Sequence, residues 1–410
     1  MQLENSHYHI QGNQITDLCK EYGTPLYVYN GAKIESQYNR LKKAFSGVNI
    51  KIKYAAKALT NQAILKLIRK CGAGIDVVSL QELQLGLMAG FQPADIMYTP
   101  NCVAFEEIRE AVKLGVTINI DNIPFLEQFG VEYGNSYPMC IRLNPHIEAG
   151  GNIKIMTGHK ASKFGISIDQ IDEVYEVFTK YNLYVAGVHV HSGSDFKSAD
   201  AFIKAADVLF DVAKNFPHLK FLDFGSGFKV AYKADDHATD IEDLGKKMTS
   251  HFKNFCQSYG RDLELWFEPG KFLVSESGYL FCTANVVKPT PAATFVGVDT
   301  GLNHLIRPMM YGAYHSIINI SNPSGAVQPY NVVGYICETD TFGTDMEMTE
   351  VKAGDIIGML NAGAYGFSMS SNYNSRFRPA EVLIHQGKAL LIRKREEMED
   401  LIRNQIEVEI

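Results

Sequence analysis

From about residue 50, two patterns of hydrophobic and polar residues alternate along the chain. Short apolar runs rich in β-branched residues are followed by longer stretches whose apolar residues recur at helical spacing, such as QAILKLIRKCG and FEEIREAVKLG. The apolar runs before residue 270 number eight and read IKYAAKA, GIDVVS, IMYTP, TINID, MCIRLNP, VAGVHVHSG, FLDFGSG and ELWFEPG. Eight strand–helix repeats over this length favour an α/β fold of the (β/α)8 TIM-barrel type. Alternation alone leaves a doubly wound open sheet as the alternative.

Beyond about residue 275 the pattern changes. Valine, threonine, tyrosine and glycine dominate, and helical periodicity stays weak until KREEMEDLIRNQ. We therefore expect a barrel over residues 26–275 and a β-rich, sandwich- or barrel-like domain formed by residues 1–25 and 276–410. The strand-like segment TPLYVYN precedes a helical IESQYNRLKKAF. That strand either joins the second domain or leads into the barrel.

Composition narrows the class of protein. The chain has 410 residues, of which 46% are hydrophobic and 21% charged, so it can bury a sizeable core. Its net charge of −7 argues against a nucleic-acid surface. Seven cysteines without a CxxC pair fit reduced thiols and neither a disulfide framework nor a zinc site. With no signal-peptide pattern or apolar membrane span, a soluble cytoplasmic protein is the expectation.

Polar or glycine residues that could carry chemistry stand at or near the ends of seven of the eight predicted strands. A barrel gathers the carboxyl ends of its strands into one mouth, so these side chains would converge there. For any one of them a plain loop start is the simpler explanation, but the mixture of a lysine, carboxylates, a histidine and a glycine turn favours catalysis. The residues are Lys57, Asp76, Asp121, Arg142, Asn144, His191, Gly225, Ser226, Gly227 and Glu268.

Lys57 is the first candidate for chemistry. A lysine in an apolar strand sheds hydration, which lowers its pKa and suits it to Schiff-base formation. The alternative is a lysine whose charged end reaches solvent at the strand end.

The glycine turn after the seventh predicted strand is a candidate phosphate site. In DFGSGF, small residues let backbone N–H groups approach a phosphate, and a following helix N-terminus would add its dipole. Ser194 and Gly270 could add further donors. Taken alone, such a turn is often only a tight turn.

Glu268 and the histidine pair complete the barrel candidates. A carboxylate paired with a pyridine nitrogen favours the protonated ring, the electron sink of pyridoxal phosphate, although Glu268 could equally pair with a nearby basic residue. His191 could stack on a ring or only fill the barrel mouth. His189 and His191 share one strand face, which also suggests a metal. A metal ranks low because no carboxylate or cysteine partner is evident at a comparable position.

The second domain contributes three further clusters. Arg307 and Tyr311 are four residues apart and suit bidentate capture of a substrate carboxylate. In YICETDTFG, Cys337 stands among carboxylates and could donate a proton, although a buried cysteine more often only packs. The segment 361–382 contains Tyr365 and Arg376. It is rich in glycine, serine and asparagine, as loops are, and could be a plain surface loop.

These motifs together resemble the diaminopimelate decarboxylases, within the barrel-type, alanine-racemase-like class of pyridoxal-phosphate enzymes. The resemblance runs nearly end to end, and its last motif separates this family from ornithine and arginine decarboxylases. The motifs are YGTPLYVYN, YAAKA, GIDVVS, TGHKASKFGI, HVHSGS, DFGSGF, EPGK, GLNHLIRPMMY, CETD and GAYGFSMSSNYNSRFRPAEV.

The resemblance implies a role for each candidate. Lys57 would hold pyridoxal 5'-phosphate as a Schiff base, His191 would stack on its ring, and Glu268 would pair with its pyridine nitrogen. Cys337 would donate the final proton. A homodimer with shared sites is implied, in which Cys337 and Glu338 serve the neighbouring chain. The remaining cofactor contacts would be Asp76, Ser194, Gly225, Ser226, Gly227, Gly270 and Tyr365, and the substrate ligands Lys271, Arg307, Tyr311, Glu338 and Tyr365.

Four departures from the family pattern bear on the substrate. Lys271 stands where the family has the arginine of EPGR, and a lysine is a point charge, not a fork. The glycine turn is GSG, Ser192 and Asp195 alter the histidine motif, and CETD is one residue short, which leaves the placement of Asp340 open. The predicted reaction is meso-2,6-diaminopimelate to L-lysine and carbon dioxide. The alternatives are a sister decarboxylase of carboxynorspermidine or D-ornithine, a racemase, and a non-catalytic regulatory homologue.

Overall fold

The computed structural model describes residues 1–147, 158–191, 193, 199–233 and 235–410. These residues form two compact units. The barrel unit consists of Glu35–Ala231 and His237–Leu273. The β-rich unit consists of Met1–Ile34, Tyr232–Asp236 and Val274–Ile410.

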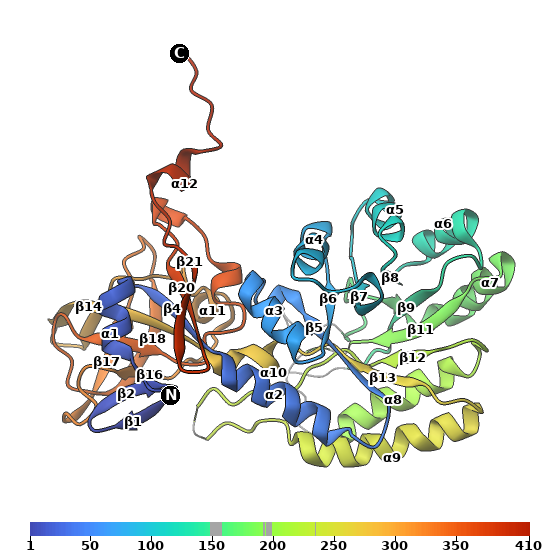
Figure 1. The fold of residues 1–410 in the computed structure, drawn as a ribbon, viewed down its shortest axis with the longest axis horizontal. Helices are drawn as coiled ribbons and strands as arrows, with labels where there is room; N and C mark the ends of the chain where they lie inside the picture. Colours follow the sequence, from blue (N-terminus) through green and yellow to red (C-terminus); the bar gives the residue numbers. More distant parts are fainter. Residues whose placement is uncertain (148–157, 192, 194–198, 234) are drawn as a thin grey trace. The chain divides into compact units, whose positions relative to one another are not determined.

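The barrel unit contains a closed ring of parallel strands (Figure 1). In the described part of the chain, eight strands follow one another in the order β9, β11, β12, β13, β5, β6, β7 and β8, and β8 pairs back to β9. This confirms the predicted barrel, and the doubly wound sheet was the wrong alternative. The strands are β5 (Ile50–Ala55), β6 (Gly74–Val77), β7 (Ile96–Tyr98), β8 (Thr117–Ile120), β9 (Met139–Asn144), β11 (Val185–Val190), β12 (Phe221–Asp223) and β13 (Glu264–Phe267), with β10 (Ile166–Ser167) beside β9.

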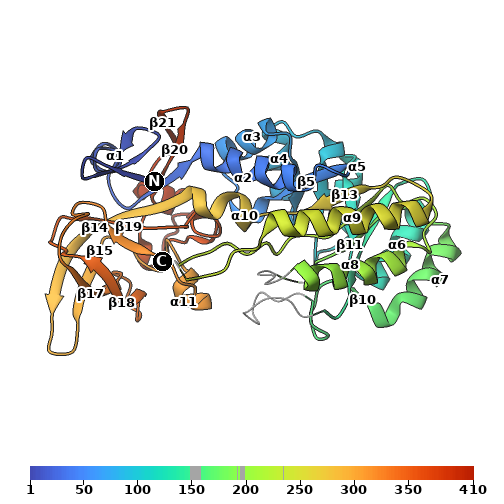
Figure 2. The same ribbon diagram turned by 90° about the horizontal axis from the view of Figure 1, so that it is seen from below.

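Helices surround this ring, and α8 and α9 lie side by side along it (Figure 2). Side-chain caps start several of them, since Ser79 Oγ accepts a hydrogen bond from the Glu82 N–H and Asn122 Oδ1 accepts from the Phe125 N–H. The helices are α2 (Gly31–Ala44), α3 (Gln62–Lys70), α4 (Leu80–Met88), α5 (Phe105–Lys113), α6 (Ile123–Tyr133), α7 (Ile171–Tyr181), α8 (Ala199–Ala213), α9 (Ile241–Tyr259) and α10 (Lys271–Val274).

The inside of the barrel is apolar at one level and polar at the next. The ring of Phe221 stacks on Trp266 with centroids 3.6 Å apart, within a buried cluster completed by Met97, Cys140 and Ala186. Because side chains alternate along a strand, the residue two positions later faces the same interior. After Met97, Cys140, Phe221 and Trp266 those later residues are polar, namely Thr99, Arg142, Asp223 and Glu268. On β11 the register shifts next to Ala186, and the residue level with Arg142 is His189.

The β-rich unit is built around the long strand β14 (Gly278–Pro289). It pairs with β4, β15 and β19, in a sheet of order β18-β17-β15-β14-β4-β20-β21. The other strands are β1 (Gln2–Glu4), β2 (His7–Ile10), β3 (Asn13–Gln14), β4 (Leu26–Asn30), β15 (Thr294–Val298), β16 (Ile317–Asn319), β17 (Val327–Val333), β18 (Thr341–Thr349), β19 (Ile356–Met359), β20 (Ala380–His385) and β21 (Lys388–Arg393). The helices are α1 (Ile15–Tyr22), α11 (Arg307–Tyr311) and α12 (Met398–Ile402).

Strand β4 corrects the domain limit drawn from the sequence. The boundary at residue 26 assigned this strand to the barrel, but β4 pairs antiparallel with β14 and parallel with β20 in the β-rich unit. Its residues Leu26 and Val28 are buried in the core of that unit with Phe281 and Val382. The strand that the sequence left open between two domains therefore joins the second one.

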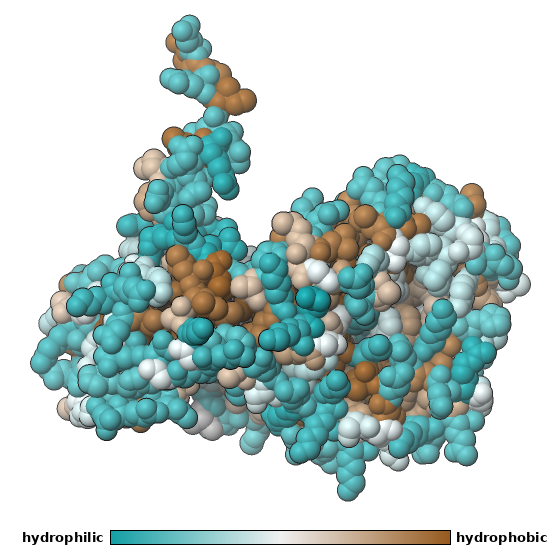
Figure 3. Space-filling view, viewed as in Figure 1, coloured by the Kyte–Doolittle hydropathy of each residue, from teal (hydrophilic) through white to brown (hydrophobic). Residues whose placement is uncertain are grey.

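Hydrophilic residues cover much of the face seen in Figure 3, and hydrophobic residues stand out on the C-terminal segment. There, Ile406, Val408 and Ile410 are exposed. Among the described residues no helix is both long and apolar enough to cross a membrane.

Candidate active site

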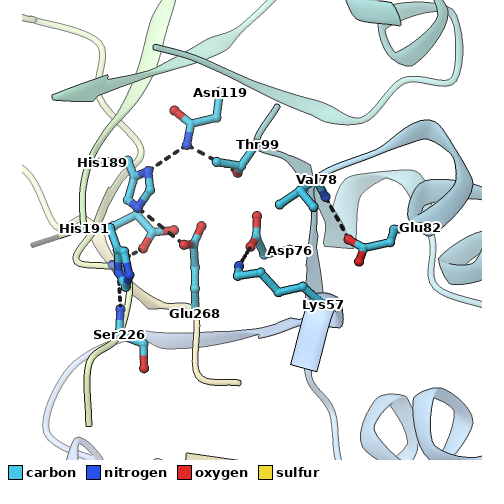
Figure 4. A network of polar contacts seen from close by, with 12 residues as sticks. Lys57, Asp76, Val78, Glu82, Thr99, Asn119, His189, His191, Ser226 and Glu268 are labelled. Carbon is cyan, nitrogen blue, oxygen red and sulfur yellow. Dashed lines mark hydrogen bonds and ion pairs between the residues drawn. The ribbon is translucent and has the colours of Figure 1, made fainter. Parts of the chain in front are cut away.

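Lys57 lies just beyond the end of β5, at the start of the barrel's polar layer. The strand ends at Ala55, and Lys57 sits in a single 3-10 turn, Ala56–Ala58. Its Nζ atom lies 3.1 Å from Oδ2 of the buried Asp76 on β6 (Figure 4). The side chain of Lys57 is 41% exposed, so the expectation of a lysine desolvated inside an apolar strand is wrong. Burial and the neighbouring Glu268 raise the pKa of Asp76, and Lys57 opposes that shift.

Glu268 follows β13 directly and faces His189 of β11 (Figure 4). The Nε2 atom of His189 lies 3.4 Å from Oε2 of Glu268, an ion-pair distance too long for a good hydrogen bond. Burial alone would raise the pKa of Glu268, but His189, Lys57 and His191 outweigh it and lower that pKa to about 2. Glu268 is therefore a buried anion at neutral pH.

His191 stands one residue past β11, against the glycine turn after β12. Its Nδ1 atom accepts a hydrogen bond from the Ser226 N–H at 3.2 Å. Burial, reinforced by Arg142, lowers the pKa of His191 to about 3, so its ring is neutral at pH 7. A Cβ atom on Gly225 would lie 2.4 Å from that Nδ1 atom, so only glycine lets the turn pack against this ring.

The same turn supplies part of the predicted phosphate cradle. Gly225 and Gly227 have φ of +58° and +108°. No helix follows immediately, because α9 begins only at Ile241; the expected helix dipole is therefore absent from this described turn. Gly270 closes the loop after Glu268, and Lys271 begins the short helix α10. Ser194 lies outside the described residues.

Two residues at this level, Asn119 and Asp223, were not named from the sequence. Asn119 Nδ2 lies 2.7 Å from His189 Nδ1, and Asp223 Oδ1 accepts a hydrogen bond from the Gly225 N–H at 2.8 Å. Arg142, which the sequence placed at the barrel mouth without a specific role, is buried, with its guanidinium 4.9 Å from the Phe164 ring. Asn119 and Asp223 also occupy inward positions near a strand end, the signal that could have identified them.

In the β-rich unit, a buried arginine is held by two aromatic side chains. Arg307 Nη1 donates to Tyr232 Oη at 3.1 Å and lies 3.2 Å from His315 Nε2. His315 Nδ1 lies 2.9 Å from the Leu360 carbonyl, which places its proton on Nδ1 and leaves Nε2 to accept. Tyr311 ends the same helix, α11, and is half-buried.

Cys337 and Glu338 are exposed and are contacted by the loop after β19. Cys337 Sγ lies 3.2 Å from Asn374 Nδ2, and Tyr373 Oη donates to Glu338 Oε1 at 3.0 Å. The hydrogen bond to Glu338, with Cys337 nearby, raises the pKa of Tyr373 to about 12. Sequence reasoning missed Tyr373 and Asn374, because nothing in a polar loop reveals which residues fold back.

The structure shows the place of Asp340, which the shortened CETD motif had left open. Its carboxylate accepts hydrogen bonds from the Leu302 N–H at 2.8 Å and the Ile336 N–H at 3.0 Å. A Cβ on Gly334 would lie 2.1 Å from this carboxylate. Asp340 therefore braces the loop that carries Cys337. Tyr365, the remaining predicted residue of this unit, is half-buried with φ of +57°.

The barrel residues fit the cofactor that the resemblance implies. Within the described residues, Glu268 Oε1, Asp223 Oδ2 and His189 Nε2 are buried and lack a hydrogen-bond partner. An unpaired, buried carboxylate oxygen such as Glu268 Oε1 can accept a hydrogen bond from a ring N–H. These three residues also form a possible metal cluster, with ligand atoms within 4.8 Å of one another. The sequence argument that no carboxylate accompanies the histidine pair is therefore wrong, although His191 faces Ser226 and is not part of that cluster.

A family profile described as "Pyridoxal-dependent decarboxylase, pyridoxal binding domain" matches residues 31–275. Among curated proteins, the chain is 37% identical to a diaminopimelate decarboxylase of Methanothermobacter thermautotrophicus, covering 98% of this chain and 96% of that protein. It is 34% identical to one of Vibrio cholerae, covering 94% of each.

Solved structures give the same result. Diaminopimelate decarboxylase from M. jannaschii in complex with L-lysine aligns with a TM-score of 0.90 at 31% identity, over 99% of this chain and 98% of that one. The Helicobacter pylori enzyme complexed with L-lysine aligns with a TM-score of 0.87 at 34% identity, over 95% and 98%.

Proposed function

The chain belongs to the diaminopimelate decarboxylase family of pyridoxal-dependent decarboxylases, and on this premise we propose that it converts meso-2,6-diaminopimelate to L-lysine and carbon dioxide. One observation carries the proposal. The barrel mouth gathers an accessible lysine, a buried anion and a neutral histidine beside a glycine turn. These are the groups needed to hold pyridoxal 5'-phosphate by its aldehyde, ring nitrogen, ring face and phosphate.

The bound cofactor supplies a protonated ring that accepts the electron pair left on the α-carbon when the carboxylate departs as carbon dioxide. Lys57 would provide the amine that anchors the cofactor. Asp76, 3.1 Å from Lys57 Nζ, holds that amine in place. Glu268 would pair with the ring nitrogen, and the neutral ring of His191 would stack on the cofactor ring without adding a charge.

The remaining candidate residues would bind the end of the substrate that does not react. Arg307 is pre-positioned by Tyr232 and His315 and suits a carboxylate. Tyr311, Glu338 and the half-buried Lys271 would add contacts to the second carboxylate and amine. Cys337 would donate a proton to the α-carbon, the atom that has lost its carboxylate.

We further propose a homodimer whose sites are shared. Supporting this, Cys337 and Glu338 are exposed in the β-rich unit. The exposed large apolar side chains of this unit include Met309, Met310, Tyr314 and Tyr373, and Tyr373 contacts Glu338. A second copy docked over Cys337, Glu338 and Tyr373 would bury them and would bring Cys337 to its partner's cofactor.

Complementation tests the shared site. Lys57→Ala and Cys337→Ala proteins are each expected to be inactive or nearly so. Unfolded and refolded together, half of the dimers would contain one intact site of two, giving about a quarter of wild-type activity. A mixture no more active than its parts would contradict the sharing.

A reducing compartment such as the cytoplasm is proposed for the protein. All seven cysteines are free, and four of them, Cys19, Cys140, Cys256 and Cys282, are buried.

A substrate panel tests the proposed function. The cofactor-loaded protein is assayed for carbon dioxide release with meso-diaminopimelate, carboxynorspermidine and D-ornithine. Lys271, in place of the family arginine, makes a sister substrate the specific rival. We expect kcat/KM to be highest for diaminopimelate; a preference for carboxynorspermidine would assign the chain to the sister activity, and no release from any would favour a regulatory homologue.

A further inference from the structure

The barrel interior beneath Glu268 holds more ionisable groups than cofactor attachment requires. His189 of β11 and Asp223 of β12 are fully buried, and their polar atoms lie within 4.8 Å of those of Glu268. In the strand register, His189 is level with Asp223 on one side and with Arg142 on the other. A buried charge is costly unless it is paired, so this cluster must have a definite distribution of protons.

Two buried carboxylates this close cannot both be ionised. Burial, Glu268 and Asp76 raise the pKa of Asp223 well above its usual range. Burial would raise the pKa of Glu268 as well, but His189 and Lys57 outweigh it and keep that pKa low. The negative charge therefore rests on Glu268, and Asp223 holds a proton.

Hydrogen bonds fix where the protons lie. Asp223 Oδ1 accepts from the Gly225 N–H, so the proton of the neutral acid is on Oδ2, which has no partner within the described residues. Asn119 Nδ2 donates to His189 Nδ1 at 2.7 Å and lies 3.4 Å from Thr99 Oγ1 (Figure 4). An imidazole that accepts at Nδ1 carries its proton on Nε2. That Nε2–H is the atom facing Glu268.

We propose that His189, oriented by Asn119 and accompanied by a protonated Asp223, is a positioning residue that holds the negative charge on Glu268 for the ring nitrogen of the cofactor. This inference rests on the proposed function. His189 need not touch the cofactor, because it acts through Glu268 Oε2. The other oxygen, Oε1, is left to accept the ring N–H.

The test pairs a residue with one atom of the cofactor. Apoprotein is titrated with pyridoxal phosphate and with its analogue in which carbon replaces the ring nitrogen, for wild type and for His189→Leu. We expect His189→Leu to weaken binding of pyridoxal phosphate at least tenfold and to leave binding of the analogue unchanged or tighter. Equal weakening for both ligands would make His189 merely structural and overturn the proposal. Wild type that binds neither ligand would instead refute the proposed function.

Three further variants sharpen the test. His189→Gln keeps an N–H near Glu268 and is expected to recover most of the pyridoxal phosphate affinity. Phe221→Leu, in the apolar layer two residues before Asp223, is the matched control: it should lower Tm and affect both ligands alike. Asp223→Asn should bind pyridoxal phosphate within threefold of wild type, because Asp223 is already neutral; a loss as large as in His189→Leu would contradict that charge assignment.

The same three side chains are also a plausible cation site. Elemental analysis of the purified protein decides this. We expect the wild-type protein to contain no metal in stoichiometric amount. A stoichiometric metal that is present in wild type and lost in His189→Leu would overturn the proposal in favour of a metal centre.

Discussion

Lys57, in the turn that follows β5, faces Asp76 of the neighbouring strand β6, with Nζ 3.1 Å from Oδ2. The Asp76 side chain is almost fully buried, whereas the Lys57 side chain is 41% exposed. The pair therefore holds a lysine at the mouth of the barrel where a ligand can reach it. This relationship makes Lys57 the expected attachment point of the cofactor.

Borohydride reduction of the cofactor-loaded protein tests that attachment. The cofactor should become fixed to the peptide that contains Lys57, as read by mass spectrometry. Lys57→Ala should lose both this adduct and the visible absorbance of lysine-bound cofactor. Lys51→Ala, an exposed lysine at the start of the same strand, is the control and should retain both. An adduct that persists in Lys57→Ala would refute the assignment.

Removing the proton donor should slow turnover without releasing the cofactor. General acid–base catalysis contributes about 10²- to 10⁴-fold, so Cys337→Ala should lower kcat by about 10²-fold or more. Cofactor content should be unchanged. Cys102→Ala, an exposed cysteine of the barrel unit, should behave as wild type. A Cys337→Ala enzyme with normal kcat would exclude this role.

Lys271 offers a gain-of-affinity experiment. An arginine there would restore the family motif and offer a planar fork to a carboxylate. Lys271→Arg is expected to lower KM for diaminopimelate by about fivefold, or about 1 kcal/mol, with kcat within twofold. Lys271→Gln should raise KM by about tenfold. If neither change moves KM, Lys271 does not contact the substrate.

Buried histidines should make the β-rich unit sensitive to mild acid. Burial lowers the pKa of His304 to about 4, and the unfolded chain binds this proton near pH 6.5. As pH falls from 6.5 towards 4, the unfolded state alone takes up the proton, so stability is lost. The cost is about 1.4 kcal/mol per pH unit for this residue.

Urea denaturation at pH 7, 6 and 5 measures that cost. The free energy of unfolding should fall more with acidification in wild type than in His304→Gln, by about 0.7 kcal/mol between pH 7 and 6 and about 1.2 kcal/mol between pH 6 and 5. His218→Gln, an exposed histidine, should keep the wild-type slope. Parallel slopes for wild type and His304→Gln would contradict the buried, neutral state of His304.

The sequence was sufficient for the barrel because its strands are marked by apolar runs and end in polar residues. Lys57, His191 and Glu268 could be named for that reason. The exposure of Lys57 could not be predicted, because β5 ends at Ala55, three residues before the end of the apolar run IKYAAKA. Strand β4 was assigned to the wrong domain because its partners, β14 and β20, are far away in sequence.

Contacts made across the barrel were the hardest to anticipate. Asn119, His189 and Asp223 lie on three different strands, and their proximity follows from closure of the ring. The metal argument failed for the same reason: Glu268 lies in another strand–loop unit from His189, yet their side chains are 3.4 Å apart. The placement of Asp340 could not be predicted either, because it depends on hydrogen bonds from the Leu302 and Ile336 N–H groups.

The most direct test of the central claim is product analysis. Purified protein loaded with pyridoxal phosphate is incubated with meso-2,6-diaminopimelate, and carbon dioxide and L-lysine are quantified together. We predict equal amounts of the two, with none formed by Lys57→Ala. Protein that carries lysine-bound cofactor yet forms no L-lysine from this substrate would contradict the account.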